Sequence, residues 1–255
     1  CALPIFKLLK IERIKCKRWK IIPFIFIAPI LVVSSGVANL STYFTPKYTQ
    51  AWPAMFIQSA LLYAYYLLPF SMIVVCVMIA GQENSHNGLL KMLALPVNRH
   101  TLSLAKFCIL VFYLLMEILV FLAVFVIAGY IAVVTSGITE TLPLSYLLKW
   151  CAGLFLTMLP SLSVMWMLTV LFEKPLLSVG LNLLLVIPGL LAGATPAWFL
   201  YPYCYSGYLV SRSLQAFTTE VTADTALQLF PFIPCAVLIF TLALFISASR
   251  FCKQT

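Results

Sequence analysis

A few long apolar runs limit what this chain can fold into. The longest, Leu102–Val134, exceeds the ~20 residues that a helix needs to cross the hydrocarbon of a membrane, and Glu117 is the one charged residue deep inside it. Charged residues make up only 9% of the chain and hydrophobic residues 63%, whereas about a quarter of the residues in soluble domains are charged. Because the runs are continuous and do not alternate as β-barrel strands do, we predict a polytopic membrane protein whose spans are helices.

The expected unit is one all-α membrane domain over residues 1–255 with six transmembrane helices. Span three is long enough that it must tilt or project beyond the bilayer. Pro188 and Gly189 should kink span five, since proline removes a helix hydrogen bond. The prediction also contains an N-terminal interfacial helix at 5–20, a cytoplasmic segment at 83–100 and an outer loop at 195–225. The six predicted spans are 21–44, 54–80, 102–134, 147–172, 176–194 and 226–248.

The formal charge of +9 lies beside the ends of the apolar runs, which favours a role in topology and lipid contact over nucleic-acid binding. If the N-terminus is cytoplasmic, thirteen of the sixteen Lys and Arg lie inside, and only Lys47, Lys149 and Arg212 lie outside. The sequence therefore predicts a multi-pass plasma-membrane protein with both termini and segment 83–100 in the cytoplasm. The basic start is followed by a span of ~24 residues without a small-residue cleavage site, so the sequence predicts a retained anchor.

Residues 5–20 carry a basic stripe of Lys10, Arg13, Lys17 and Lys20, with Trp19 among the apolar residues roughly opposite. This pattern predicts a helix on the cytoplasmic leaflet with its cations near anionic head groups. A disordered basic tail is the alternative.

Two features in or beside the spans are candidate sites. A carboxylate at the position of Glu117 costs about 2.5 to 3.5 kcal/mol on insertion scales, which makes it a candidate proton relay. The alternative is a protonated or hydrogen-bonded side chain that locks helices together. The aromatic stretch that contains Trp198, Tyr201, Tyr203 and Tyr205 is either an interfacial belt or a lip at which an amphiphilic substrate leaves the outer leaflet.

Signatures of catalysis are missing from the sequence. It contains no GxxxxGK[ST] phosphate loop, no HExxH and no GxSxG, and its eight cysteines form no CxxC pair. We therefore expect no catalytic residue, no bound cofactor and no metal on this chain. An intramembrane enzyme that uses Glu117 or His86, and a scaffold that holds a cytoplasmic partner, are the alternative classes.

The cytoplasmic segment carries a motif that resembles a known family. Glu83 is followed by Gly88–Lys91, then by Leu95–Val97 and Arg99, and Lys106 opens the next span. This order resembles the segment between spans two and three of type-2 ABC exporter permeases. The size and character of the chain are most similar to the permease subunits of lantibiotic-immunity transporters.

The resemblance implies an ABC-2 type transmembrane domain without catalysis of its own. The segment Asn87–Leu95, which Pro96 terminates, would be a coupling helix in a groove of a cytoplasmic ABC ATPase, present in two copies that bind ATP and Mg. Glu83 and Arg99 would contact that ATPase or brace the helix. The residues implied in coupling are Glu83, Asn87, Gly88, Leu89, Leu90, Lys91, Met92, Leu95, Pro96 and Arg99.

The same resemblance implies that residues 5–20 form a connecting helix and that 195–225 form a re-entrant outer hairpin. A second permease, identical or related, would complete the transporter in the lipid of a bacterial cell membrane. The implied cargo is a lantibiotic or similar amphiphilic antimicrobial peptide, expelled to the medium for self-immunity or resistance. A bacitracin-like drug or a lipid stays open as the cargo.

Overall fold

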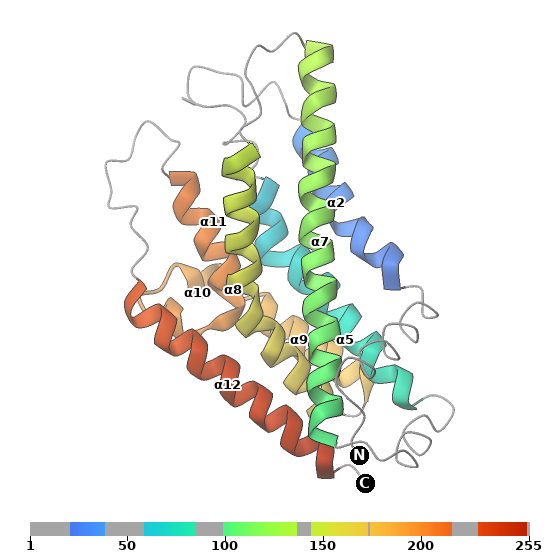
Figure 1. The fold of residues 1–255 in the computed structure, drawn as a ribbon. Coiled ribbons are helices and arrows are strands. Elements are labelled where there is room, and N and C mark those ends of the chain that lie inside the picture. The colour runs from blue at the N-terminus through green and yellow to red at the C-terminus, as the bar shows by residue number, and fades with distance from the viewer. Residues whose placement is uncertain are drawn as a thin grey trace.

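The computed structural model describes residues 21–38, 59–84, 99–136, 144–172, 174–215 and 229–253, and these residues are helical apart from short connections (Figure 1). In chain order the elements are α2 (Ile21–Ala38), the π-helical turn η1 (Tyr63–Leu67), α5 (Leu68–Asn84), α7 (Arg99–Ser136), α8 (Leu144–Leu171), α9 (Pro175–Val186), α10 (Gly189–Gly193), the 3-10 turns η3 (Trp198–Leu200) and η4 (Pro202–Cys204), α11 (Tyr205–Gln215) and α12 (Leu229–Lys253).

Five helices among the described residues are long and apolar enough to cross a membrane, which confirms the prediction of an all-helical membrane protein. These helices are Ser59–Gly81, His100–Ile131, Leu144–Leu171, Pro175–Gly193 and Phe230–Arg250. The apolar helix Ile21–Gly36 is shorter, and residues 39–44 of predicted span one lie outside the described residues.

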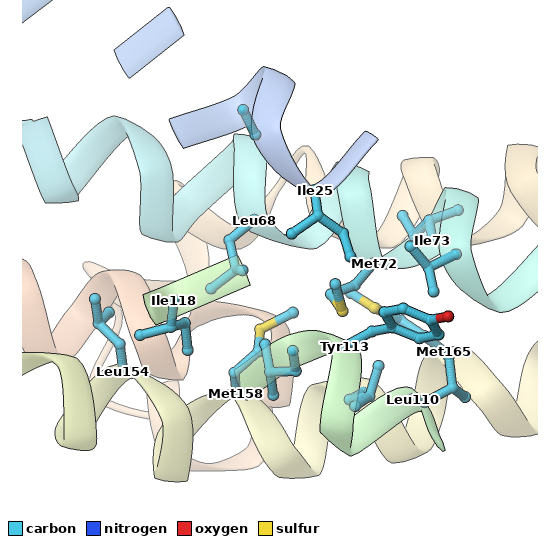
Figure 2. Packing of buried hydrophobic residues seen from close by; sticks show 14 of the residues in the cluster. Ile25, Leu68, Met72, Ile73, Leu110, Tyr113, Ile118, Leu154, Met158 and Met165 are labelled. Atoms are coloured by element: carbon cyan, nitrogen blue, oxygen red, sulfur yellow. The ribbon is translucent and has the colours of Figure 1, made fainter. Parts of the chain in front are cut away.

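Helices α2, α5, α7 and α8 form the centre of the bundle, where α2 packs on α7 and α5 packs on α8. Figure 2 shows how side chains from these four helices meet. The core side chains labelled there are Ile25, Leu68, Met72, Ile73, Leu110, Tyr113, Ile118, Leu154, Met158 and Met165. Because α5 and α7 run in opposite directions, the end of α5 and the start of α7 lie at the same end of the bundle, together with the end of α12 (Figure 1).

Helices α9 and α12 lie at the periphery. Only 22% of the membrane-length window of α9 and 17% of that of α12 is buried, against 61% for α8. Leu184 on α9 and Phe245 on α12 are among the exposed apolar side chains. An apolar surface of this extent on helices of membrane-spanning length is what lipid or a neighbouring subunit covers.

The helix of span five is interrupted where the sequence predicts a kink. α9 ends at Val186, the backbone turns through Ile187 and Pro188, and α10 begins at Gly189. The part of the predicted outer loop that the structure describes is largely helical, because it contains η3, η4 and α11. These short helices turn back against α8 and η1, so they belong to the bundle.

Candidate functional site

Glu117 lies on the inner face of α7 and has no exposed surface. The Ser71 hydroxyl on α5 donates a hydrogen bond to its Oε1 over 2.5 Å, and the same hydroxyl lies 2.9 Å from the carbonyl of Leu68. This contact joins α5 to α7 inside the apolar core. The sequence allows Glu117 to be a proton relay or a hydrogen-bonded link between helices. For the link, the structure provides a partner, Ser71.

Tyr63 lies beside the same carboxyl group and comes from the π-helical turn η1. Its ring stacks on Phe121 of α7, with the ring centroids 4.4 Å apart and the planes 10° apart. The Tyr63 hydroxyl and the Glu117 Oε2 are both buried, and among the described residues neither has the geometry of a hydrogen bond to a partner. Turns of π-helix inside α-helices are often found at functional sites. The π-helical turn beside Glu117 therefore makes this buried polar group a candidate functional site.

The chemistry open to this site follows from its surroundings. Ser71 and Tyr63 are the polar side chains that face Glu117 in the described part of the chain, and neither is a cation. A buried carboxylate without a cation is strongly disfavoured, so the neutral acid is the favoured form. In that form Glu117 can act as both a donor and an acceptor, and its bond with Ser71 joins α5 to α7.

The predicted exit residues form a packed cluster. Trp198, Tyr203 and Tyr205 are buried and Tyr201 is half-buried. Trp198 stacks on Tyr208 of α11 with their ring centroids 3.9 Å apart. Aromatic side chains with this degree of burial stabilise the fold of segment 195–215, and they do not present an open row of rings to water.

The hydroxyl groups of this cluster are directed into the bundle. The Tyr201 hydroxyl donates to the carbonyl of Leu185, and the Tyr203 hydroxyl donates to Oδ1 of Asn182 over 2.9 Å. Asn182 in turn donates through Nδ2 to the carbonyl of Ser178 over 2.9 Å. Segment 195–215 is therefore joined to α9 by hydrogen bonds of Tyr201 and Tyr203, which a general aromatic belt does not predict.

The π-helical turn η1 makes a second contact with this segment, through α11. The Ser206 hydroxyl of α11 donates to the carbonyl of Ala64 over 2.9 Å. Tyr65 lies directly against Gly207, where an added Cβ would come within 2.3 Å of the ring. Sequence reasoning missed Ser206 and Gly207, although the presence of Ser-Gly inside an aromatic run is a signal of close backbone approach.

Beside the aromatic cluster lies an apolar cavity of about 420 Å³ between α8, α11 and α12. Gly153 and Pro160 of α8, Trp198 and Tyr208 of the cluster, and Ala236 of α12 are among the residues that line it. Among the described residues, no three His, Cys, Asp or Glu side chains come together as a metal site would require.

The remaining predicted residues fall largely outside the described part of the chain. The interfacial helix 5–20 and the coupling residues between Asn87 and Pro96 lie outside it. Glu83 is in the last turn of α5 and Arg99 begins α7, so both flank the predicted coupling segment at one end of the bundle. Lys106, which closes the motif, is buried on α7.

Comparison with known proteins identifies one family. The family model described as "ABC-2 family transporter protein" matches residues 8–189, which is most of the chain. The match includes residues 8–20 of the predicted connecting helix and all of the predicted coupling segment, and it ends where α10 begins. No curated protein shows significant similarity to the chain.

Proposed function

Since the chain belongs to the ABC-2 family of transporter proteins, we propose that it is the permease subunit of an ATP-driven exporter that expels a lantibiotic or a similar amphiphilic peptide. Membership makes the chain a multi-pass membrane protein of an ABC transporter and implies association with ABC ATPase subunits. The observation that carries the proposal is the family match across segment 83–100, together with the placement of the ends of α5 and α7 at one end of the bundle.

The distribution of charge supports a cytoplasmic position for that end. Arg99, Lys106 and Arg250 lie in the parts of α7 and α12 near it, whereas Lys149 and Arg212 lie in the parts of α8 and α11 near the other end. By the positive-inside rule, the end with α5, α7 and α12 faces the cytoplasm of a bacterial cell. Segment 83–100 is then available to a cytoplasmic ATPase that carries ATP and Mg.

The internal contacts suggest how a push on that segment reaches the far side. Ser71 and Glu117 join α5 to α7, so the two helices that flank the coupling segment move together. Farther along, Ser206 joins α11 to the carbonyl of Ala64 in the π-helical turn that precedes α5. A displacement of α5 is therefore transmitted to the outer aromatic segment through the turn, which is the deformable part of that span.

ATP drives this change only if nucleotide binds the two conformations of the transporter with different affinity. In our proposal, two ATPase subunits close on ATP and push the coupling segments of two permeases, and the packing of α2, α5 and α9 between the permeases changes. The exposed apolar faces of α2 and α9, which include Ile30 and Leu184, are available for a second permease. That permease is a second copy of this chain or a related one.

The proposed cargo is a cationic amphiphilic peptide taken from the membrane and released to the medium. Its support is the resemblance to lantibiotic-immunity permeases, and a bacitracin-like drug or a lipid is the alternative cargo. The outer aromatic segment would serve as the element that the cargo passes on release. The chain itself contributes no catalytic group to this cycle.

The test is protection of cells that express the chain together with its ATPase. We expect a raised inhibitory concentration of a lantibiotic such as nisin, and faster loss of labelled peptide from the cell membrane. The double variant Leu89→Asp/Leu90→Asp should abolish protection, while the matched variant Leu89→Met/Leu90→Met should retain it. Protection against bacitracin alone would reassign the cargo, and equal protection by both double variants would overturn the coupling role.

A further inference from the structure

The apolar cavity between α8, α11 and α12 has the features of a lipid site. Its rim includes Leu156 on α8 and Ile233 and Val237 on α12, which are between 48% and 63% exposed. Both helices are of membrane-spanning length, so the mouth of the cavity opens toward hydrocarbon. Its volume of about 420 Å³ lies within the ~300 to 1,000 Å³ of typical small-molecule sites.

An empty apolar cavity of this size is unfavourable in a membrane. The atoms that line it lack partners for dispersion contacts, and its wall offers little to hold water. A flexible hydrocarbon chain that enters from the bilayer supplies those contacts. The lining supports this match, because most of it is apolar side chains such as Leu159, Leu209 and Phe240.

Two cations, Lys149 of α8 and Arg212 of α11, lie one helical turn beyond residues that line the cavity, at the same end of it. On α8, Lys149 lies one turn before Gly153 and on the same face, since residues four apart are neighbours on a helix. On α11, Arg212 lies four residues after Tyr208, and its Nε donates to the Tyr208 hydroxyl over 3.0 Å. The side chain of Leu209 lies against Gly153, so the two faces are in contact.

We propose that this cavity binds one acyl chain of an anionic phospholipid whose phosphate is held by Arg212 and Lys149. The guanidinium group of Arg212 has further N–H donors of the kind that phosphate oxygens accept. A cationic peptide is a poor occupant, because the two cations would repel it. The proposal requires only that α8 and α12 lie in a membrane, so it can fail or hold independently of the proposed export.

The test is lipid binding to the delipidated, purified chain, measured by native mass spectrometry with phosphatidylglycerol and phosphatidylcholine of the same acyl chains. We expect tighter binding of phosphatidylglycerol. Each of Lys149→Gln and Arg212→Gln should weaken its binding about fivefold and leave phosphatidylcholine unchanged. Arg250→Gln, which removes an exposed cation at the other end of the bundle, is the matched control and should change neither lipid.

Filling the cavity tests the site of the acyl chain. Ala236→Phe should abolish binding of both lipids and Ala236→Leu should weaken it, while Leu238→Phe on the exposed face of α12 should have no effect. A diazirine on the acyl chain should label peptides from 153–160 or 232–240. The proposal would be overturned by equal affinity for the two lipids or by unchanged binding in both Ala236 variants. It would also be overturned if a lantibiotic reduced the labelling and phosphatidylglycerol did not.

Discussion

Replacing Glu117 by Gln separates a structural lock from a proton relay. Glutamine keeps a carbonyl oxygen that can accept from Ser71, whose hydroxyl lies 2.5 Å from Oε1 of Glu117. Its amide can also donate to the Tyr63 hydroxyl, which the carboxylic acid only approaches. If Glu117 is a neutral acid, we expect the free energy of unfolding to change by less than ~1 kcal/mol.

Glu117→Leu measures how much the hydrogen bond between Ser71 and Glu117 contributes to the free energy of unfolding. Hydrogen bonds between membrane helices are worth ~0.6 kcal/mol on average and up to ~1.7 kcal/mol in double-mutant cycles. The loss should stay within that range because the Ser71 hydroxyl, once freed from Glu117, can donate to the carbonyl of Leu68 at 2.9 Å. The cycle of Glu117→Leu with Ser71→Ala should return a coupling energy of the same sign and order.

The assay is reversible unfolding in mixed micelles, with export measured in parallel in cells. A stabilisation of Glu117→Gln by about 3 kcal/mol would show that the native side chain carries its costly charge and would refute the neutral lock. Loss of export in Glu117→Gln with folding and ATP turnover intact would instead establish the relay.

Three further predictions concern segment 195–215. Tyr203→Phe leaves Oδ1 of Asn182 without its donor and should lower the free energy of unfolding by ~0.6 to 1.7 kcal/mol, as measured by the same unfolding assay. Burial raises the pKa of the Cys204 thiol to about 12, so the reactive thiolate is scarce at neutral pH and maleimide should label Cys204 only after unfolding. Gly207→Ala should lower the thermal midpoint and expression, because its Cβ would lie 2.3 Å from the Tyr65 ring.

Matched variants decide whether these effects are local. Gly180→Ala, where an added Cβ meets no atom within 4 Å, should be tolerated, and a similar loss in both alanine variants would contradict the close approach of Tyr65. Tyr201→Phe removes a different hydroxyl, and its effect should add to that of Tyr203→Phe in the double variant. Rapid labelling of Cys204 in the folded protein would show that segment 195–215 is open.

The apolar runs were sufficient to predict the helical class of the fold, because lipid leaves the backbone few other ways to satisfy its hydrogen bonds. The break at Pro188 was also predictable, since it depends on one residue's missing N–H group. The partners of Glu117 were not, because Ser71 and Tyr63 come from another span and their pairing depends on the register between helices. The π-helical turn shifts that register, and nothing in the sequence around Tyr63 signals it.

The aromatic segment shows the same limit. Composition alone places Trp198 and Tyr203 at an interface, and it cannot distinguish a solvated belt from rings that pack against the bundle. That distinction depends on distant groups such as Asn182 and Ala64, which provide the hydrogen-bond partners. The cavity beside the cluster is likewise formed by helices far apart in sequence, so no local pattern predicts it.

We propose that a separate ATPase drives this chain through the segment between α5 and α7. This role is tested most directly with a chain that has no cysteine except the one introduced by Met92→Cys, cross-linked in membranes that contain the ATPase. The control is Leu144→Cys in the same background, at the other end of the bundle. We predict that the cysteine at position 92 cross-links to the ATPase and is protected from an impermeant maleimide in intact cells, while the cysteine at 144 does neither. Labelling of position 92 from outside the cell, or its failure to contact the ATPase in an active complex, would contradict the account.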